Sequence, residues 1–205
     1  MAEAEQQEKR HSRLSFVREL VVLVLTALVL AVGIKTFVAQ AFYIPSGSMS
    51  PQLGVNDRIV VSKLSYRLHD PRRGDIVVFD SPTPVPEPER PLPQRLVRGL
   101  GQALGVTPPS TNEFVKRVIA LPGERVEARG GKVYVDGREV VEPYLPEGAV
   151  TSDFSPVAVP EGSVWVMGDN RANSADSRVF GAIPESTIVG RAIVRVWPLP
   201  DASFL

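Results

Sequence analysis

Ser48 is the residue of this 205-residue chain that is best placed to act as a nucleophile. It lies in Ile44-Pro-Ser-Gly-Ser-Met-Ser-Pro51, where a proline on each side stiffens the backbone and Gly47 permits a tight turn that presents the hydroxyl. A serine hydroxyl is a poor nucleophile and needs a base that accepts its proton. Without such a base the segment is typical of a Ser/Pro/Gly linker, so the hypothesis depends on a proton acceptor elsewhere.

The composition leaves lysine as that base. The chain has no cysteine, which excludes cysteine nucleophiles, disulfide scaffolds and cysteine-ligated metals. Two histidines cannot build a multi-histidine metal site, and neither is positioned for a triad: His11 precedes a long apolar segment, and His69 opens a turn-like His-Asp-Pro. Carboxylates are usually weak bases toward serine. Of the lysines, Lys63 and Lys116 lie in strand-like segments.

Lys116 is the better candidate because its strand is apolar on both faces. Phe114, Val118 and Ala120 share its own face. Burial disfavours the ammonium form, so the pKa falls from its ordinary value near 10.4, and a drop of roughly two units makes the neutral amine abundant near pH 8. The alternative is a lysine at a strand edge with its ammonium in water.

A third polar segment, Gly168-Asp-Asn-Arg-Ala-Asn-Ser-Ala-Asp-Ser-Arg178, follows the strand-like residues 163–167. Its aspartates and arginines can pair with one another. A solvated turn or a calcium loop are alternatives, although the segment lacks the spacing and the terminal glutamate of an EF-hand. The pattern favours a polar loop that supports a site.

The N-terminal part of the chain predicts a membrane anchor. Residues 20–34 carry no charge, and continuing to Phe42 gives a helix of roughly 34 Å, enough for the ~30 Å hydrocarbon core. Basic residues precede this segment, which predicts a cytoplasmic tail at 1–19, a transmembrane anchor at 20–42 and an extracytoplasmic domain at 43–205. The alternative is a cleaved signal peptide, since Ala39-Gln40-Ala41 has the small-x-small pattern of a cleavage site.

The outer portion predicts a mostly β protein. Short alternating segments separated by turn signals indicate strands at 58–64, 76–79, 113–121, 132–135, 139–141, 163–167 and 188–197, with Asp136-Gly137 as a hairpin turn. No amphipathic helix is evident outside the anchor. We therefore expect a single N-terminal transmembrane helix followed by a compact all-β catalytic domain of small curled antiparallel sheets. The composition of a proline-rich stretch at about 81–112 predicts a surface insertion.

Charge argues against nucleic acid as a partner, because 23 basic residues balance 23 acidic ones. The motifs instead resemble those of the bacterial type I signal peptidases (leader peptidases), a serine/lysine dyad family. They occur in the family's order: the apolar segment, Phe42–Met49 with Pro51 and Leu53, Gly74–Phe79, Lys116–Glu124, and Gly168–Arg178. Four motifs in the family's order, preceded by an apolar segment, indicate this family far more specifically than any single motif does.

The resemblance implies a role for each matching residue. Ser48 is the nucleophile, Lys116 the general base, and the Ser46 hydroxyl joins the Ser48 N–H in the oxyanion hole. Ser174 orients the lysine, and an ion pair between Asp176 and Arg178 supports the loop. Small substrate pockets that prefer Ala-x-Ala before the cut are lined by Ile44, Met49, Leu53, Phe114 and Val115.

The resemblance also implies an activity: a membrane-anchored endopeptidase that removes signal peptides from translocated preproteins through an acyl-enzyme, with no metal or cofactor. Its expected partners are these preproteins, the lipid bilayer and a nearby secretion translocon. Its expected location is the bacterial cytoplasmic membrane, single-pass, with the N-terminus inside. Two rivals are a self-cleaving stress-response repressor, which would carry a DNA-binding helix-turn-helix in place of the membrane helix, and a non-enzymatic anchored β scaffold or assembly factor.

Overall fold

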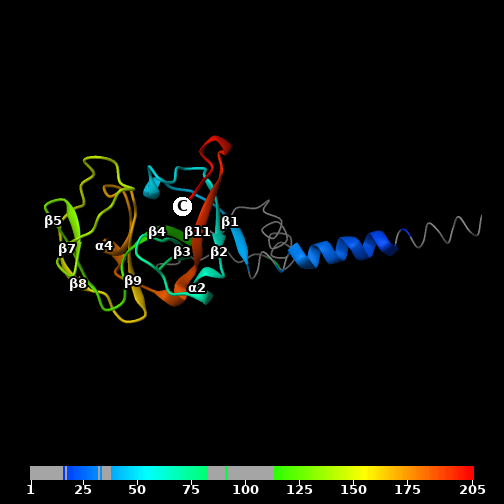
Figure 1. Cartoon of the computed structure of the whole chain (residues 1–205), viewed down its shortest axis with the longest axis horizontal. Coiled ribbons are helices and arrows are strands. Elements are labelled where there is room, and N and C mark those ends of the chain that lie inside the picture. Colours follow the sequence, from blue (N-terminus) through cyan, green and yellow to red (C-terminus); the bar gives the residue numbers. More distant parts are fainter. Residues whose placement is uncertain (1–15, 17, 32, 34–37, 83–90, 92–112) are drawn as a thin grey trace, which may run out of the picture. The chain divides into compact units, whose positions relative to one another are not determined.

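The computed structural model describes residues 16, 18–31, 33, 38–82, 91 and 113–205 (Figure 1). The chain divides into two compact units, Met1–Val38 and Ala39–Leu205. Most of the predicted cytoplasmic tail and most of the predicted 81–112 insertion lie outside the described residues.

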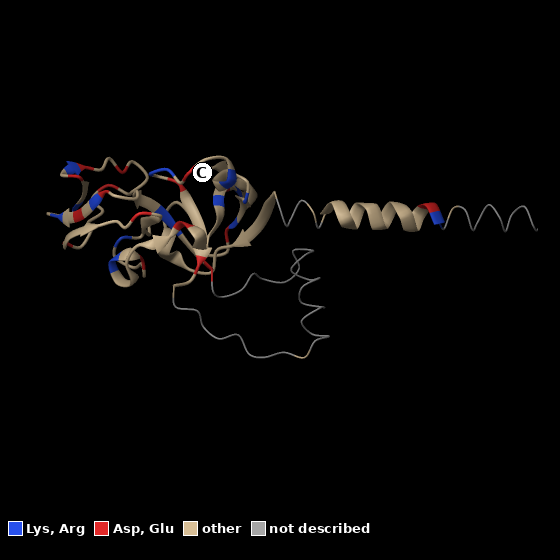
Figure 2. Cartoon of the chain, turned by 90° about the horizontal axis from the view of Figure 1, so that it is seen from below, with Lys and Arg blue, Asp and Glu red and all other residues tan. Residues whose placement is uncertain are grey.

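Residues 18–31 of the first unit form a helix. Arg18 and Glu19 are its charged residues, and no further Lys, Arg, Asp or Glu follows them up to residue 31 (Figure 2). Leu23 and Val29 are exposed in the isolated chain. None of the helices within the described residues has the length and hydropathy needed to cross a membrane.

Two antiparallel sheets make up the second unit. The larger runs in the order β1-β2-β11-β3-β4-β9-β10, with β12 paired to β11, and the smaller in the order β7-β6-β5-β8. The strands of the larger sheet are β1 (Ala39–Tyr43), β2 (Arg58–Ser62), β3 (Ile76–Asp80), β4 (Glu113–Ala120), β9 (Ser163–Met167), β10 (Ile183–Pro184), β11 (Ile188–Trp197) and β12 (Ser203–Phe204). Those of the smaller sheet are β5 (Arg125–Arg129), β6 (Lys132–Val135), β7 (Arg138–Glu139) and β8 (Phe154–Ala158).

The helices among the described residues of this unit are single turns. They are α2 (Ser65–Leu68), α4 (Ser177–Phe180) and the 3-10 helices η1 (Gly47–Met49), η2 (Glu185–Thr187) and η3 (Leu199–Asp201). The prediction of a mostly β protein with antiparallel sheets is therefore confirmed. Basic and acidic residues are interspersed along the strands and loops of this unit (Figure 2).

Strand β1 differs from the sequence-based expectation. Residues 39–42 were assigned to the membrane segment, but here Ala39–Tyr43 pairs antiparallel with β2, with Ala41 opposite Val60. The side chain of Phe42 is 3% exposed and packs in the core. Because these residues are apolar, hydropathy alone does not separate them from the segment before them.

The core consists of three adjoining apolar clusters. One lies beneath β1 and β2 and includes Phe42, Ile44, Met49 and Leu53. A second lies along the smaller sheet, where Phe154 and Trp165 stack, and a third lies on β3, β4 and β9. In Figure 1, β5, β7 and β8 gather at one end of this unit, away from β2, β3 and β11. Helix η1 carries Ser48, the nucleophile expected from the sequence, and is called the nucleophile turn below. It rests on the first cluster.

Candidate active site

Ser48 is the middle residue of the 3-10 helix η1, which follows strand β1 after the short connection at residues 44–46. Met49 and Leu53, both fully buried, anchor this turn in the core. The chain is held further by Ile44, whose N–H donates to the Asp57 carbonyl at 2.9 Å. The apolar residues on either side of Ser48 therefore fix the turn, and its hydroxyl points toward β4.

Lys116 lies in strand β4, between β3 and β9 in the sheet. A hydrogen bond of 2.8 Å joins its Nζ to Ser48 Oγ, and a second of 2.9 Å joins it to the Val115 carbonyl. The residue is 4% exposed, and Nζ lies 5.4 Å from the centroid of the Phe114 ring. The sequence thus predicted correctly that this lysine is buried, and the alternative of a solvated strand-edge lysine is wrong.

Burial lowers the pKa of Lys116 from its ordinary value of 10.5 to about 8. The nearby carboxylates of Asp176 and Asp169 act in the opposite direction, since they favour the ammonium form, but the loss of hydration outweighs them. A substantial fraction of this amine is neutral near pH 8, so it can take a proton from the hydroxyl it contacts.

Ser46 precedes η1 as its N-cap residue. Its Oγ lies 3.3 Å from Ser48 Oγ. The Ser48 N–H belongs to the first turn of η1, where backbone donors have no acceptor within the helix. The Ser46 hydroxyl and the Ser48 N–H, which the resemblance assigns to the oxyanion hole, therefore lie close to the Ser48 side chain, and their role in catalysis stays a prediction.

The loop that follows β9 packs against the nucleophile turn. Gly168 is so close to Ser48 that a Cβ would collide with the Ser48 carbonyl oxygen and with the Ser174 side chain. The Asn170 N–H donates to the Ser48 carbonyl at 3.0 Å, and Asn170 Nδ2 donates to the Gly47 carbonyl at 3.1 Å. This part of the polar segment is thus in direct contact with the candidate site.

Asp176 and Arg178 form the expected ion pair, with 2.8 Å between Arg178 Nη2 and Asp176 Oδ2. Burial alone would raise the pKa of Asp176, but hydrogen bonds from Arg178 and the Gly168 N–H lower it, so the carboxyl is ionised. No hydrogen bond between Ser174 and Lys116 is found among the described residues. The orienting role of Ser174 therefore stays a prediction.

Sequence reasoning missed two buried ion pairs that hold this loop. Arg117, next to the candidate base, donates from Nε to Asp169 Oδ1 at 2.8 Å. Arg171 is 3% exposed and pairs with Glu142 in a bidentate contact. The partners are 52 and 29 residues apart, so no local pattern reveals them. An arginine inside an otherwise apolar strand was the available signal for Arg117.

Four of the five predicted pocket residues lie together. Ile44, Met49 and Leu53 belong to the cluster beneath η1, and Val115 packs against it. Phe114 instead packs on the third cluster, beside Phe79 at a centroid distance of 6.0 Å. The first four residues surround the base of the nucleophile turn, and their contact with substrate remains a prediction.

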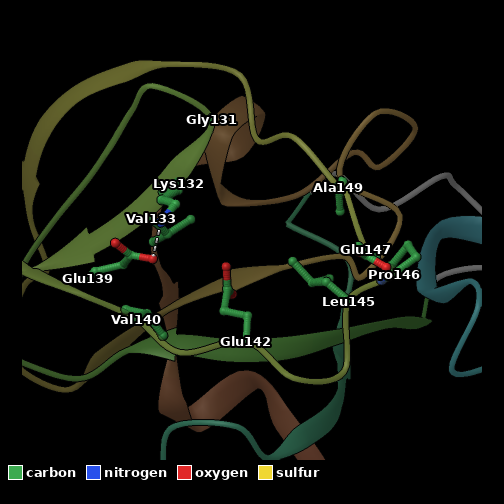
Figure 3. A pocket seen from close by; sticks show the side chains of 11 residues that line it. Gly131, Lys132, Val133, Glu139, Val140, Glu142, Leu145, Pro146, Glu147 and Ala149 are labelled. Atoms are coloured by element: carbon green, nitrogen blue, oxygen red, sulfur yellow. Dashed lines mark hydrogen bonds and ion pairs between the residues drawn. The ribbon is translucent and has the colours of Figure 1, made fainter.

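A surface pocket lies elsewhere, on the smaller sheet (Figure 3). Lys132 and Glu139 form an ion pair on one side of it, and Glu142 and Leu145 project into it from the following segment. None of the predicted site residues lines this pocket. Among the described residues, no group of three or more His, Cys, Asp or Glu side chains converges as metal ligands would.

The family model and the similar relatives all identify this chain with one family. A family model described as signal peptidase, peptidase S26, matches residues 17–197. Signal peptidase I of Leptolyngbya laminosa is 47% identical over 174 residues, which cover 84% of this chain and 76% of the relative. Probable signal peptidase I-2 of Synechocystis sp. is 42% identical over 180 residues, covering 88% and 73%.

A signal peptidase I from Mycobacterium tuberculosis is 38% identical over 227 residues, which cover 95% of this chain and 77% of the relative. The matched region thus includes both the N-terminal apolar segment and the β unit. These matches do not fit the repressor or the non-enzymatic scaffold. The chain belongs to peptidase family S26 and is a type I signal peptidase, a serine endopeptidase that removes signal peptides.

Proposed function

We propose that Ser48 and Lys116 are the catalytic dyad through which this peptidase cuts preproteins. The observation that carries the proposal is the 2.8 Å contact between Lys116 Nζ and Ser48 Oγ in a site where the lysine is 4% exposed. Proximity and a lowered pKa are the two properties a general base needs.

The reaction then runs in two halves. Ser48 Oγ attacks the scissile carbonyl carbon while its proton passes to neutral Lys116, and the carbonyl oxygen becomes an anion that accepts hydrogen bonds from the Ser48 N–H and the Ser46 hydroxyl. The C–N bond breaks as Lys116 returns the proton to the leaving amine. Neutral Lys116 next takes a proton from water, the hydroxide attacks the ester, and Ser48 recovers its proton as the signal peptide is released.

Substrate preference follows from the apolar side chains around the nucleophile turn. We assign Ile44, Met49, Leu53, Phe114 and Val115 to small pockets that favour Ala-x-Ala before the cut. The shared packing of Ile44, Met49, Leu53 and Val115 beneath η1 supports the assignment of these four residues, and Phe114 is included because it precedes Val115 in strand β4. Ser174, Asp176 and Arg178 keep the neighbouring loop in place.

We further propose that the peptidase is a single-pass protein of the bacterial cytoplasmic membrane, with a cytoplasmic tail at 1–19 and an anchor that begins at Leu20 and ends before strand β1. The uncharged residues 20–34 and the basic residues before them support this topology. Cleavage after Ala41 would cut through β1, which argues for a retained anchor. The catalytic unit then faces preproteins leaving the translocon.

The dyad is tested by Ser48→Ala and Lys116→Ala in the detergent-solubilised full chain, assayed on a preprotein. Both variants are expected to lose cleavage by several orders of magnitude. Ser50→Ala, next to the same turn, and Lys63→Ala, directly after strand β2, are matched controls that should cut normally. Near-normal cleavage by either dyad variant would refute the assignment.

A further inference from the structure

Within the part of the chain that the structure describes, the peptide unit between Gly47 and Ser48 is hydrogen-bonded through its carbonyl, and no acceptor is found for its N–H. Its carbonyl, on Gly47, accepts a hydrogen bond from Asn170 Nδ2 at 3.1 Å and another from the Ser50 N–H at 3.1 Å. Its N–H, on Ser48, is the backbone donor assigned above to the oxyanion hole. The carbonyl and the oxyanion donor are therefore two ends of one rigid unit.

In a trans peptide the C=O and N–H bonds point in opposite directions across a planar group. Holding the Gly47 carbonyl toward Asn170 therefore aims the Ser48 N–H the other way, away from Asn170, and fixes its direction. A hydrogen bond to the carbonyl also polarises the amide, which makes its N–H a stronger donor. Both effects stabilise the negative charge that develops on the scissile carbonyl oxygen during the reaction.

Asn170 is itself held in place. Its N–H donates to the Ser48 carbonyl at 3.0 Å, so the residue binds two consecutive carbonyls of the nucleophile turn. Its own carbonyl accepts from the Asn173 N–H at 3.0 Å. The next residue, Arg171, is 3% exposed and donates from Nε to the Gly168 carbonyl at 3.1 Å. The side-chain amide thus reaches Gly47 from a rigid loop.

We propose that Asn170 is a positioning residue of the oxyanion hole, which acts through the Gly47 carbonyl on the Ser48 N–H. This inference rests on the proposed dyad mechanism and adds to it a residue that touches neither the substrate nor Lys116. The side chain is separated from Gly47 by 123 positions in the sequence, so it joins the turn only in the folded chain.

The test uses two substitutions in the full chain. Asn170→Ala removes the side-chain donor and keeps the backbone N–H, and Asn170→Asp keeps the shape but places a carboxylate oxygen against the Gly47 carbonyl. We expect kcat to fall about tenfold or more, less than the ~10²–10³-fold loss typical of deleting a direct oxyanion donor, with KM little changed. Asn173→Asp puts the same new charge in the same loop, on an exposed side chain, and is expected to leave kcat unchanged.

Two further readouts separate positioning from general loosening of the loop. A peptide boronate with alanine at the cleaved position forms a tetrahedral adduct with Ser48, so its inhibition constant should rise by about the factor by which kcat/KM falls. The pH midpoint of kcat/KM should be the same in Asn170→Ala as in the wild type, because the amide does not contact Lys116.

Each other outcome counts against the inference. Unchanged kcat, a rise in KM alone, or boronate affinity that does not follow kcat/KM would overturn it. If both variants lose their cooperative thermal unfolding, Asn170 is a structural residue of the loop and the proposal is wrong. Ser48→Ala is measured in parallel: an inactive Ser48→Ala beside fully active Asn170 variants refutes this inference alone, whereas an active Ser48→Ala refutes the dyad.

Discussion

Two opposing influences act on the Lys116 amine: burial, which removes water from the ammonium, and the carboxylates of Asp176 and Asp169. Burial prevails and the pKa is about 8. Because the neutral amine is the base, kcat/KM should fall about tenfold per pH unit below that value and level off above it. A pH–rate profile of preprotein cleavage measures this directly. A midpoint at the ordinary lysine value of 10.5, or a flat profile around pH 8, would contradict it.

Lys116 should also make stability depend on pH. The pKa is 10.5 in the unfolded chain and about 8 in the folded protein, so between these values the unfolded state binds more protons. Raising the pH through this window therefore stabilises the folded state, whereas below pH 8 the full penalty of a buried ammonium is present.

Replacing Lys116 by methionine removes that penalty. Lys116→Met should be inactive yet more stable than the wild type at pH 7, and its advantage should shrink as the pH rises from about 8 toward 10.5. Thermal or urea unfolding across this range measures the difference. A difference that does not vary with pH would show that the lysine is hydrated in the folded protein.

Ser48 and Lys116 were predicted from sequence by two kinds of argument together. The absence of cysteine and the unsupported histidines reduced the number of candidates, and the order of motifs that resembles the type I signal peptidases then singled out this serine and this lysine. Asn170 could not be found in this way. Its function depends on a contact with Gly47 across 123 positions, and an Asn in a polar loop is also typical of an ordinary turn.

At the scale of elements, alternation predicted the strands that bury one face or both. β9 and β11 were predicted at their observed bounds, since Ser163–Met167 and Ile188–Trp197 are mostly apolar and are followed by turn residues. β5 was missed because Arg125–Arg129 presents charged side chains outward and buries only Val126 and Ala128. Pairing with β6 and β8, rather than its own hydropathy, makes this segment a strand.

The contact between the loop after β9 and helix η1 leads to a prediction about Gly168. An added Cβ would collide with the Ser48 carbonyl oxygen and would lie 2.6 Å from Ser174 Cβ, so one of the two elements must move. Because small displacements of reacting groups reduce rates by about 10²-fold, Gly168→Ala should lose at least that factor in kcat. Gly54→Ala is the matched control, since its Cβ would meet Asp57 Oδ1 at an ordinary 3.7 Å.

Cleavage assays and thermal unfolding of both glycine variants separate the possible outcomes. Gly168→Ala should keep a cooperative unfolding transition, because the collision involves a loop and a single helical turn rather than the sheet. Near-normal kcat in this variant would mean that the loop can retreat without moving Ser48, and the close packing would then have no catalytic importance.

At the scale of the whole molecule, the sequence indicated two parts, and the chain does divide into two compact units. The boundary was harder to place. Apolar residues are frequent both in residues 20–34, which we propose as the anchor, and in β1, and it is the pairing between Ala39–Tyr43 and β2 that assigns the latter to the β unit. Hydropathy measures only preference for an apolar surrounding, so it cannot distinguish lipid from the protein core.

The absence of cysteine allows the proposed topology to be tested without removing any native residue that reacts with thiol reagents. Ser12→Cys places a reporter in the N-terminal tail, and Ser152→Cys places one at an exposed position of the β unit. In intact spheroplasts a membrane-impermeant maleimide should label the Ser152→Cys chain and spare the Ser12→Cys chain, because the basic residues before Leu20 keep the tail in the cytoplasm. Lysis should make both sites reactive. Labelling of Ser12→Cys alone in intact spheroplasts would mean that the chain is inverted, with its dyad facing the cytoplasm, where it could not meet translocated preproteins.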